Sequence, residues 1–414
     1  MKKFKMLFSL FVVSLLIAGF FLPTKFNPKV FSDTNPSVNV DVITNELSEV
    51  LKTWIVKNDS QYYKDITVEC HPISVVIKDG KAEVVFHGAI SEMLKAKTAH
   101  ELPEIRGMQK FLKLKQANLS HGKLSAVNDE INYWVKTVNE NYIGKIEAGN
   151  FGFKVVADLT DEGHIQKETA KLFLEDAEGG FEEITNGLYL SPDEMEQDGF
   201  EHAKKIADNA KDIGIEGFYI DTYNGTAAAQ YAEAHSSNSS GLYDSSYWNN
   251  TEFPFALTMM NSPYGSDCAD FVSQAMYKGG IPMDPDYLHD RSHWWCNMYS
   301  STPPPDYAPW IWIKPASQNN YTGLKNYMLQ IRGYWERTDI HHVRVGGIMV
   351  SQSNDHVMMV TGNDSVKMYL TAHTQDRKHY VFYDIKTDTF ITTNPPDYYK
   401  NCEYYNVHKY TWVN

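Results

Sequence analysis

The sequence predicts an α+β protein with two globular domains, and three observations support this fold class. The chain has 414 residues, more than one ordinary hydrophobic core accommodates. Hydrophobic residues make up 43% of the sequence and aromatic residues 13%, which is ample for two cores. Helical periodicity and strand-like alternation occur in both halves of the chain, so each half is expected to combine helices with a sheet.

Residues 1–32 predict an export signal or a membrane anchor. Lys2, Lys3 and Lys5 precede an apolar run from Met6 to Leu22. The run is somewhat long for a cleaved signal and somewhat short for a membrane span, so both alternatives stay open. We expect a protein that is secreted or held on the extracellular face of the cell envelope, with membrane contact only through this segment.

Residues 33–190 predict an α+β domain of unknown role. Asp41–Val56 has the apolar spacing of a helix. Two strands, Ile73–Ile77 and Ala82–Phe86, are joined by Asp79-Gly80, a common hairpin turn. The remaining expected elements are a helix over 102–114 and strands over 131–138, 142–147 and 152–157. Nothing in this domain carries recognisable chemistry.

Residues 191–222 predict a helical connector, and residues 223–414 predict the second domain. Ser191-Pro192 opens the connector helix, because serine caps helices and proline suits their first turn. The second domain is expected to start with a helix near Thr226, which ends in a polar loop that reaches Gly241.

Charge and cysteine content exclude several classes of function. The formal net charge of -14 argues against a nucleic-acid partner, because phosphate binding needs a clustered basic surface. The four cysteines are too few for a disulfide scaffold and lack the spacing of a metal site. They are Cys70, Cys268, Cys296 and Cys402.

Cys268 stands in the strongest local signal, the segment Ser266–Met276 that is closed by Gly279-Gly280. Apolar residues at helical spacing predict a helix here, so Cys268 falls in its first turn. There the unpaired backbone N–H groups and the helix dipole favour a thiolate and can hold an oxyanion. Asp267 is expected to cap this helix or to steady the site beside the substrate. The alternative is that Cys268 is a small buried hydrophobic residue.

Two histidines on later strands are the candidate partners of Cys268. Strands are predicted over 344–350, 356–360 and 367–374, and a hairpin centred between residues 364 and 365 would place His356 opposite His373. One ring nitrogen would then face the nucleophile while the other is held, which is what a general base needs. A register shift of one residue would move His373 to the other face. Each histidine alone is equally explained as a polar residue of a strand edge or solvated face.

Trp294 and Trp295 are candidate substrate-binding residues, because aromatic side chains stack on sugars and peptides. Such a pair is also typical of core or lid packing. The adjacent histidines His341-His342 suggest a metal site, but they lack the companion spacing of a zinc site. We therefore predict no metal and no cofactor.

The segments around these residues resemble the bacterial "Putative amidase domain" family. The similarity covers about residues 223–390 and extends to the larger group of papain-like cell-wall cysteine peptidases. There are two departures from the family pattern, since Gly347 stands where an acidic residue is usual and Ala269-Asp270 replaces Thr-Asn. The segments that carry the resemblance, in the family's order, are Asp267–Gln274, Gly279–Met283, Trp294-Trp295, Gly347–Val350, His356–Thr361 and His373–Arg377.

The resemblance implies a papain-like fold for residues 223–414, with the cysteine-bearing helix packed on an antiparallel sheet. It also implies Cys268 as nucleophile, His356 as base and His373 as orienting group. The expected protein is a secreted or surface thiol hydrolase that cleaves an amide or peptide bond, in cell-wall peptide or a similar peptidoglycan-type substrate, through an acyl-enzyme. Two alternatives stay open: an acyltransferase using the same cysteine, and a non-catalytic surface binding module on this scaffold.

Overall fold

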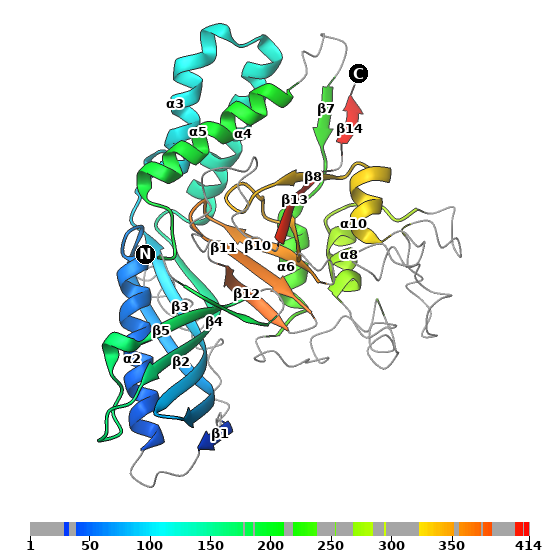
Figure 1. Cartoon of the computed structure of the whole chain (residues 1–414). Coiled ribbons are helices and arrows are strands. Elements are labelled where there is room, and N and C mark those ends of the chain that lie inside the picture. The colour runs from blue at the N-terminus through cyan, green and yellow to red at the C-terminus, as the bar shows by residue number, and fades with distance from the viewer. Residues whose placement is uncertain are drawn as a thin grey trace, which may run out of the picture.

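The computed structural model is a mixed α+β structure built around one large, mostly antiparallel sheet (Figure 1). The α+β class is therefore as predicted. Among the described residues this sheet has 12 strands, in the order β1-β2-β3-β4-β12-β11-β10-β9-β13-β8, with β5 paired to β4 and β6 to β5. No helix in the described part of the chain is long and apolar enough to cross a bilayer. The structure describes residues 29–32, 39–176, 179–184, 187–210, 218–237, 253, 268–284, 294, 323–351, 356–373, 376–382, 402–408 and 410–413.

The N-terminal part of the sheet is a long hairpin covered by one helix, α2 (Val40–Asp59). Asn39 caps this helix, because its side chain accepts a hydrogen bond from the backbone N–H of Asp41 (3.0 Å). The hairpin turns at Asp79-Gly80, where both residues have positive φ, as its tight turn requires. The predicted helix and hairpin are confirmed. The strands here are β1 (Lys29–Ser32), β2 (Tyr63–Lys78), β3 (Lys81–Leu94), β4 (Ile146–Asp158), β5 (Lys171–Glu175) and β6 (Phe181–Glu183).

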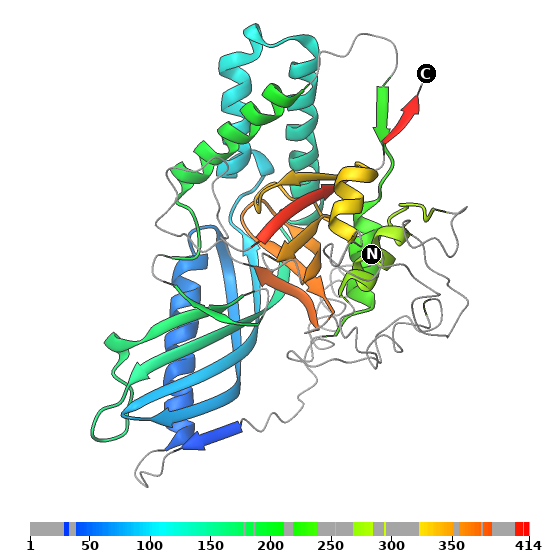
Figure 2. The same cartoon turned by 45° about the vertical axis from the view of Figure 1, so that its right-hand side comes forward.

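Three helices gather beyond one end of this hairpin and pack on one another as a three-helix unit (Figures 1 and 2). They are α3 (Pro103–Lys115), α4 (His121–Asn141) and α5 (Pro192–Asn209). The strand predicted over 131–138 is wrong, because this segment lies within α4. Ile131, Trp134 and Val138 are buried at helical spacing on one side of that helix. Of the strand predicted over 142–147, only the last two residues are extended, as the start of β4.

The connector helix α5 begins where the sequence predicted it. The hydroxyl of Ser191 accepts a hydrogen bond from the backbone N–H of Glu194 (3.3 Å), and the Glu194 carboxylate accepts one from the backbone N–H of Ser191 (2.9 Å). This reciprocal pair satisfies two backbone donors at the helix start. Pro192 follows as the first helical residue, where its missing N–H costs nothing.

Two glycines let α3 and α5 touch backbone to backbone. A Cβ atom at Gly107 would lie 1.9 Å from the carbonyl oxygen of Glu196, and one at Gly199 would lie 2.0 Å from that of Glu104. No side chain larger than hydrogen fits at either contact. The close crossing brings the polar residues at the start of α3 next to those in the middle of α5.

The C-terminal part supplies the other strands and two helices that cover one face of them. α6 (Gly225–Ala234) and α8 (Cys268–Lys278) pack together and against β10 (Val357–Asn363) and β11 (Met368–Ala372) (Figure 2). The remaining elements are β7 (Phe218–Asp221), α10 (Leu324–Asn326), the π-helical turn η6 (Tyr327–Ile331), β8 (Trp335–Thr338), β9 (Ile348–Ser351), β12 (Arg377–Phe382), β13 (Cys402–Val407) and β14 (Tyr410–Val413).

The N-terminal and C-terminal parts share the large sheet and a buried ion cluster. β12 runs parallel to β4, with Tyr380 opposite Asn150. The ammonium group of Lys367 lies 3.1 Å from a carboxylate oxygen of Asp59 and pairs with Glu92. All three side chains of this ion cluster are completely buried. Charged groups withdrawn from water therefore hold the two parts together.

Candidate active site

Cys268 is the first described residue of α8 and is completely buried. It belongs to the hydrophobic cluster in which α6 and α8 pack on β9 and β10. The helix ends at the two glycines that the sequence predicted, and Gly280 has a φ of +98°, a conformation that favours glycine. Asp267, the predicted cap and substrate contact, lies outside the described residues.

Buried polar contacts fix the orientation of α8. The Gln274 side-chain amide donates a hydrogen bond to the Asp270 carboxylate (2.8 Å), and the Tyr231 hydroxyl donates one to the Gln274 carbonyl oxygen (2.6 Å). Because Tyr231 belongs to α6, this chain of bonds couples the two helices. Hydrogen bonds of this kind, shielded from water, hold a helix at a defined rotation about its axis.

Trp294 is a buried packing residue in this structure. Its indole N–H donates a hydrogen bond to the hydroxyl of Ser273 on α8 (3.1 Å), and its backbone N–H donates one to the Asp284 carboxylate (2.9 Å). Only 1% of the residue is exposed. Its partner in the predicted substrate contact, Trp295, lies outside the described residues.

His373 lies directly against α8. Its ring stacks on that of Phe271, with centroids 3.9 Å apart, and Phe271 is one helical turn beyond Cys268. The Nε2 atom lies 2.5 Å from the backbone carbonyl oxygen of His235, which can only accept a hydrogen bond, so Nε2 carries the proton. Burial lowers the pKa of His373, and Asp376 partly opposes that shift. A neutral ring held in this way has its lone pair on Nδ1.

His356 stands one residue before β10. Its backbone carbonyl accepts a hydrogen bond from the N–H of Ser351 (2.9 Å), and its own N–H donates to the Ser351 hydroxyl (3.1 Å). Its buried Nε2 atom has no hydrogen-bond partner among the described residues. Burial and the nearby charge of Arg377 lower the pKa of His356 to about 3, so this imidazole is neutral at physiological pH.

The register predicted for the two histidines is wrong by one residue. Met359 pairs with Thr371, so the same register places Val357, and not His356, opposite His373. The turn is centred one residue later than predicted, since Asn363 pairs with Met368, and an irregularity between Val360 and Gly362 reverses part of this shift further along the strands.

The consequence for the site follows from the alternation of side chains along β10. Val357 and Met359 pack in the same cluster as Cys268, whereas Met358 and Val360 pack in a different cluster. His356 precedes β10 by one residue, and continued alternation of side chains would place it on the face of Met358. Among the described contacts, those of His373 reach the helix of Cys268 and those of His356 do not.

A cavity of about 550 Å³ lies between α4, α6 and the start of β9. His379, on its wall, bridges the carboxylates of Glu147 (2.9 Å) and Glu233 (2.6 Å). Burial opposes a charge on this ring, but the two carboxylates outweigh it and raise the pKa of His379 to about 9. Sequence analysis missed this group, because its partners lie far away in the chain. The described residues that line this cavity do not include Cys268.

Residues that could hold a metal ion gather elsewhere, where α3 and α5 meet the loop before β9. Two overlapping sets of side chains have ligand atoms within 4.8 Å of one another. They are His202, Asp339 and His342, and Glu104, Asp198 and His342. Of these, the sequence had singled out only His342.

A family model matches the C-terminal part of the chain. Residues 222–393 match the family model described as "Putative amidase domain". The predicted resemblance to this family is thereby confirmed, and the name of the family indicates an amide-bond hydrolase. No curated protein and no solved structure gave a significant match. Similarity to papain-like peptidases stays a prediction.

Proposed function

We propose that residues 222–393 form a thiol amidase in which Cys268 attacks an amide carbonyl and carries the acyl group. The observation that supports this most directly is the stacking of His373 on Phe271, one turn of α8 from Cys268. A backbone carbonyl holds the Nε2 of that ring, so the other ring nitrogen is the basic one. A sulfur and a neutral, fixed imidazole on one side of a sheet are the two groups that the chemistry needs.

In the proposed reaction, the imidazole takes the proton of the Cys268 thiol, and the thiolate forms a bond to the carbonyl carbon. The negative oxygen that develops is held by backbone N–H groups at the start of the helix. The imidazolium then gives its proton to the leaving nitrogen, the C–N bond breaks, and a thioester remains. Water, deprotonated by the same imidazole, forms a bond to the thioester carbon, the C–S bond breaks and a carboxylic acid leaves, and the imidazolium returns its proton to the Cys268 sulfur.

The base is one of two histidines. The family resemblance gives this role to His356 and makes His373 the orienting group, whereas the contacts with α8 favour His373 as the base. The two assignments differ in the effect of single substitutions. With His373 as base, His373→Gln lowers kcat about 10²–10⁴-fold and His356→Gln lowers it much less. A larger loss of kcat in His356→Gln than in His373→Gln would show that His356 is the base.

We further propose that the substrate is an amide or peptide bond of cell-wall peptide, outside the cytoplasm. The predicted export segment at residues 1–32 and the family of residues 222–393 support this. The test is digestion of purified peptidoglycan fragments, followed by mass spectrometry of the products. Intact fragments after incubation with the full chain would remove this substrate class but leave the thiol chemistry to be tested separately.

A non-catalytic binding module is the second candidate, and the complete burial of Cys268 favours it. Alkylation by iodoacetamide at pH 7 separates the two candidates without a known substrate. An activated thiolate reacts faster than a thiol of the unfolded chain, and His373→Gln removes the advantage. A rate equal to that of the unfolded chain would instead leave only the binding module.

Cys70 provides the internal control for this labelling. Burial raises the pKa of its thiol to about 11, so it should react slowly at pH 7 in the same sample. Peptide mapping by mass spectrometry reports both sites at once. Cys268→Ala should abolish hydrolysis of any substrate found, while Cys70→Ala should leave it unchanged.

A further inference from the structure

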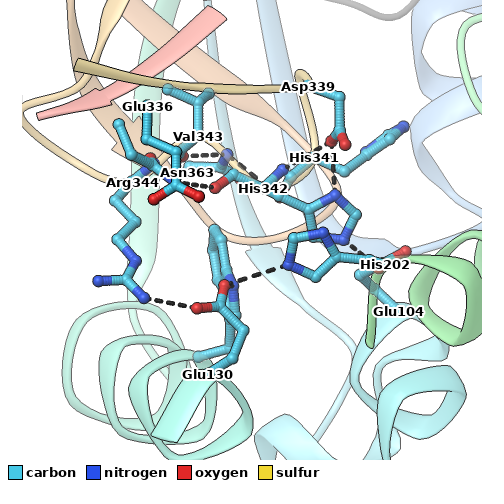
Figure 3. A network of polar contacts seen from close by, with 12 residues as sticks. Glu104, Glu130, His202, Glu336, Asp339, His341, His342, Val343, Arg344 and Asn363 are labelled. Atoms are coloured by element: carbon cyan, nitrogen blue, oxygen red, sulfur yellow. Dashed lines mark hydrogen bonds and ion pairs between the residues drawn. The ribbon is translucent and has the colours of Figure 1, made fainter. Parts of the chain in front are cut away.

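Imidazoles and carboxylates fill the junction between the three-helix unit and the loop that leads into β9 (Figure 3). Glu104 comes from α3 and His202 from α5, while Asp339 and His342 belong to the loop. His342 and Glu104 are buried to 99% or more, and His202 to 93%. The Gly107 and Gly199 contacts described above allow this convergence, because they bring α3 against α5.

His342 stands at the centre of the group. Its Nδ1 lies 2.5 Å from a carboxylate oxygen of Asp339, and its Nε2 lies 2.5 Å from one of Glu104. The His202 ring lies flat on the His342 ring, with centroids 3.4 Å apart and planes 5° from parallel (Figure 3). Two protonated rings would repel each other at this separation. One of the two imidazoles is therefore neutral, as a metal ligand must be.

His202 is the neutral ring. Its Nε2 lies 3.2 Å from a carboxylate oxygen of Glu130, which can only accept, so Nε2 carries the proton and Nδ1 the lone pair. That buried Nδ1 has no hydrogen-bond partner in the described part of the chain, and neither has Oε2 of Glu104. An imidazole nitrogen and a carboxylate oxygen, both atoms of the kinds that bind metals, are thus buried here without a hydrogen-bond donor among the described residues.

The excess of carboxylates at this junction also favours a bound cation. Glu104, Glu130, Asp198 and Asp339 bring four carboxylates to this junction. Arg344 is paired with Glu130 (2.5 Å). These carboxylates outnumber the positive charge of Arg344, and a divalent ion that takes the place of a proton on His342 would offset part of the difference.

The surroundings hold the ligands in place. The Asn363 side-chain amide donates hydrogen bonds to the carbonyls of Ile340 (3.1 Å) and Val343 (2.8 Å), which fixes the loop on both sides of His342. The Trp134 indole N–H donates to the same Glu130 oxygen that faces His202 (2.8 Å). Partners that orient a ligating imidazole and its carboxylate are the usual support of a metal site.

We propose that a single divalent transition-metal ion of the zinc class binds at this junction and ties the three-helix unit to the C-terminal part. Two imidazoles and one carboxylate form a ligand set that suits zinc. The ligands are His202, His342 and Asp339, while the Glu104 carboxylate stays on the other ring nitrogen of His342.

The first test uses the full chain stripped of metal with a chelator and titrated with Zn²⁺ and with Co²⁺. We expect one ion per chain, a rise in Tm of several degrees on binding, and a visible Co²⁺ spectrum without the charge-transfer band of a thiolate ligand. Cys268→Ser should bind Co²⁺ as the wild type does. No stoichiometric binding, or a thiolate band that Cys268→Ser removes, would overturn the proposal.

The second test locates the ligands. Asp339→Asn and His202→Gln should each weaken Zn²⁺ binding at least tenfold and abolish the rise in Tm, with an unchanged circular dichroism spectrum. His71→Gln, at an exposed histidine on β2, is the matched control and should bind as the wild type does. Equal affinity in all three variants would contradict the proposal. If a ligand variant fails to fold, the Co²⁺ spectrum of the wild type still decides.

Discussion

The charged side chain of Lys367 is completely buried. Its ammonium group is paired with the carboxylates of Asp59 and Glu92, which are equally buried. Burial raises the pKa of Glu92 to about 8, so Lys367→Met would leave chiefly the Asp59 carboxylate uncompensated in the core. We expect it to lower the free energy of unfolding by about 3–5 kcal/mol, measured by urea denaturation.

Lys81→Met is the matched control for that prediction. Lys81 also pairs with a carboxylate, that of Asp158, but both side chains are largely exposed. A surface ion pair contributes at most about 1 kcal/mol, so this variant should be nearly neutral. Similar losses in the two lysine variants would show that burial of the ion cluster is not what matters.

His379 predicts a dependence of stability on pH. Its pKa of about 9 in the folded chain exceeds that of a free imidazole, so its contribution is complete below about pH 6.5 and is lost as pH rises through 9. Other groups titrate in the same range, so the difference from His379→Gln is the quantity to measure. The wild type should lose up to about 3 kcal/mol more than the variant between pH 6.5 and 9. Parallel curves would contradict the proposed ion bridges.

At the scale of elements, the contact between α3 and α5 depends on the absence of side chains at two positions. Gly107→Ala would place a Cβ within 1.9 Å of a backbone oxygen that belongs to the opposite helix. The helices must then move apart, at a cost of about 1–3 kcal/mol or more, measured by thermal unfolding. Lys113→Ala, an exposed change on the same helix, should leave Tm within one or two degrees.

Elements with a clear local pattern could be predicted from the sequence, and those that depend on distant contacts could not. The capped helix α5 and the Asp79-Gly80 hairpin have their signals within a few residues. The segment 131–138 was misread because its β-branched and aromatic residues suggest a strand, although their spacing is helical. In the site, the position of Cys268 on a helix followed from local spacing. The register of His356 did not, because the exact turn residues of this hairpin and its irregularity have no clear signal in a single sequence.

At the scale of the whole molecule, the N-terminal and C-terminal parts share a core. Val366, Tyr369 and Val381 belong to the C-terminal part, yet they pack in the cluster formed mainly by α2 and the N-terminal strands. Burial of this kind couples the stability of one part to that of the other. The metal site proposed above would add a second link across the same boundary.

We therefore expect a single cooperative unfolding transition. Urea denaturation followed by far-ultraviolet circular dichroism and by tryptophan fluorescence should give coincident curves. Replacement of the buried Tyr369 by alanine should shift both curves together, because it removes contacts that the two parts share. Two separate transitions, with only one of them moved by Tyr369→Ala, would show that the parts unfold independently.

The pairing of β7 with β14 has a consequence for how the C-terminal part is connected. Tyr410 lies opposite Asp221 and Val413 opposite Phe218, in antiparallel register. The chain thus enters and leaves this part at neighbouring points. Segments with adjacent ends tolerate circular permutation, since a few added residues bridge the old termini while new ones open in an exposed loop. The order of the helices and strands along the chain could change in this part while their arrangement in space stays the same.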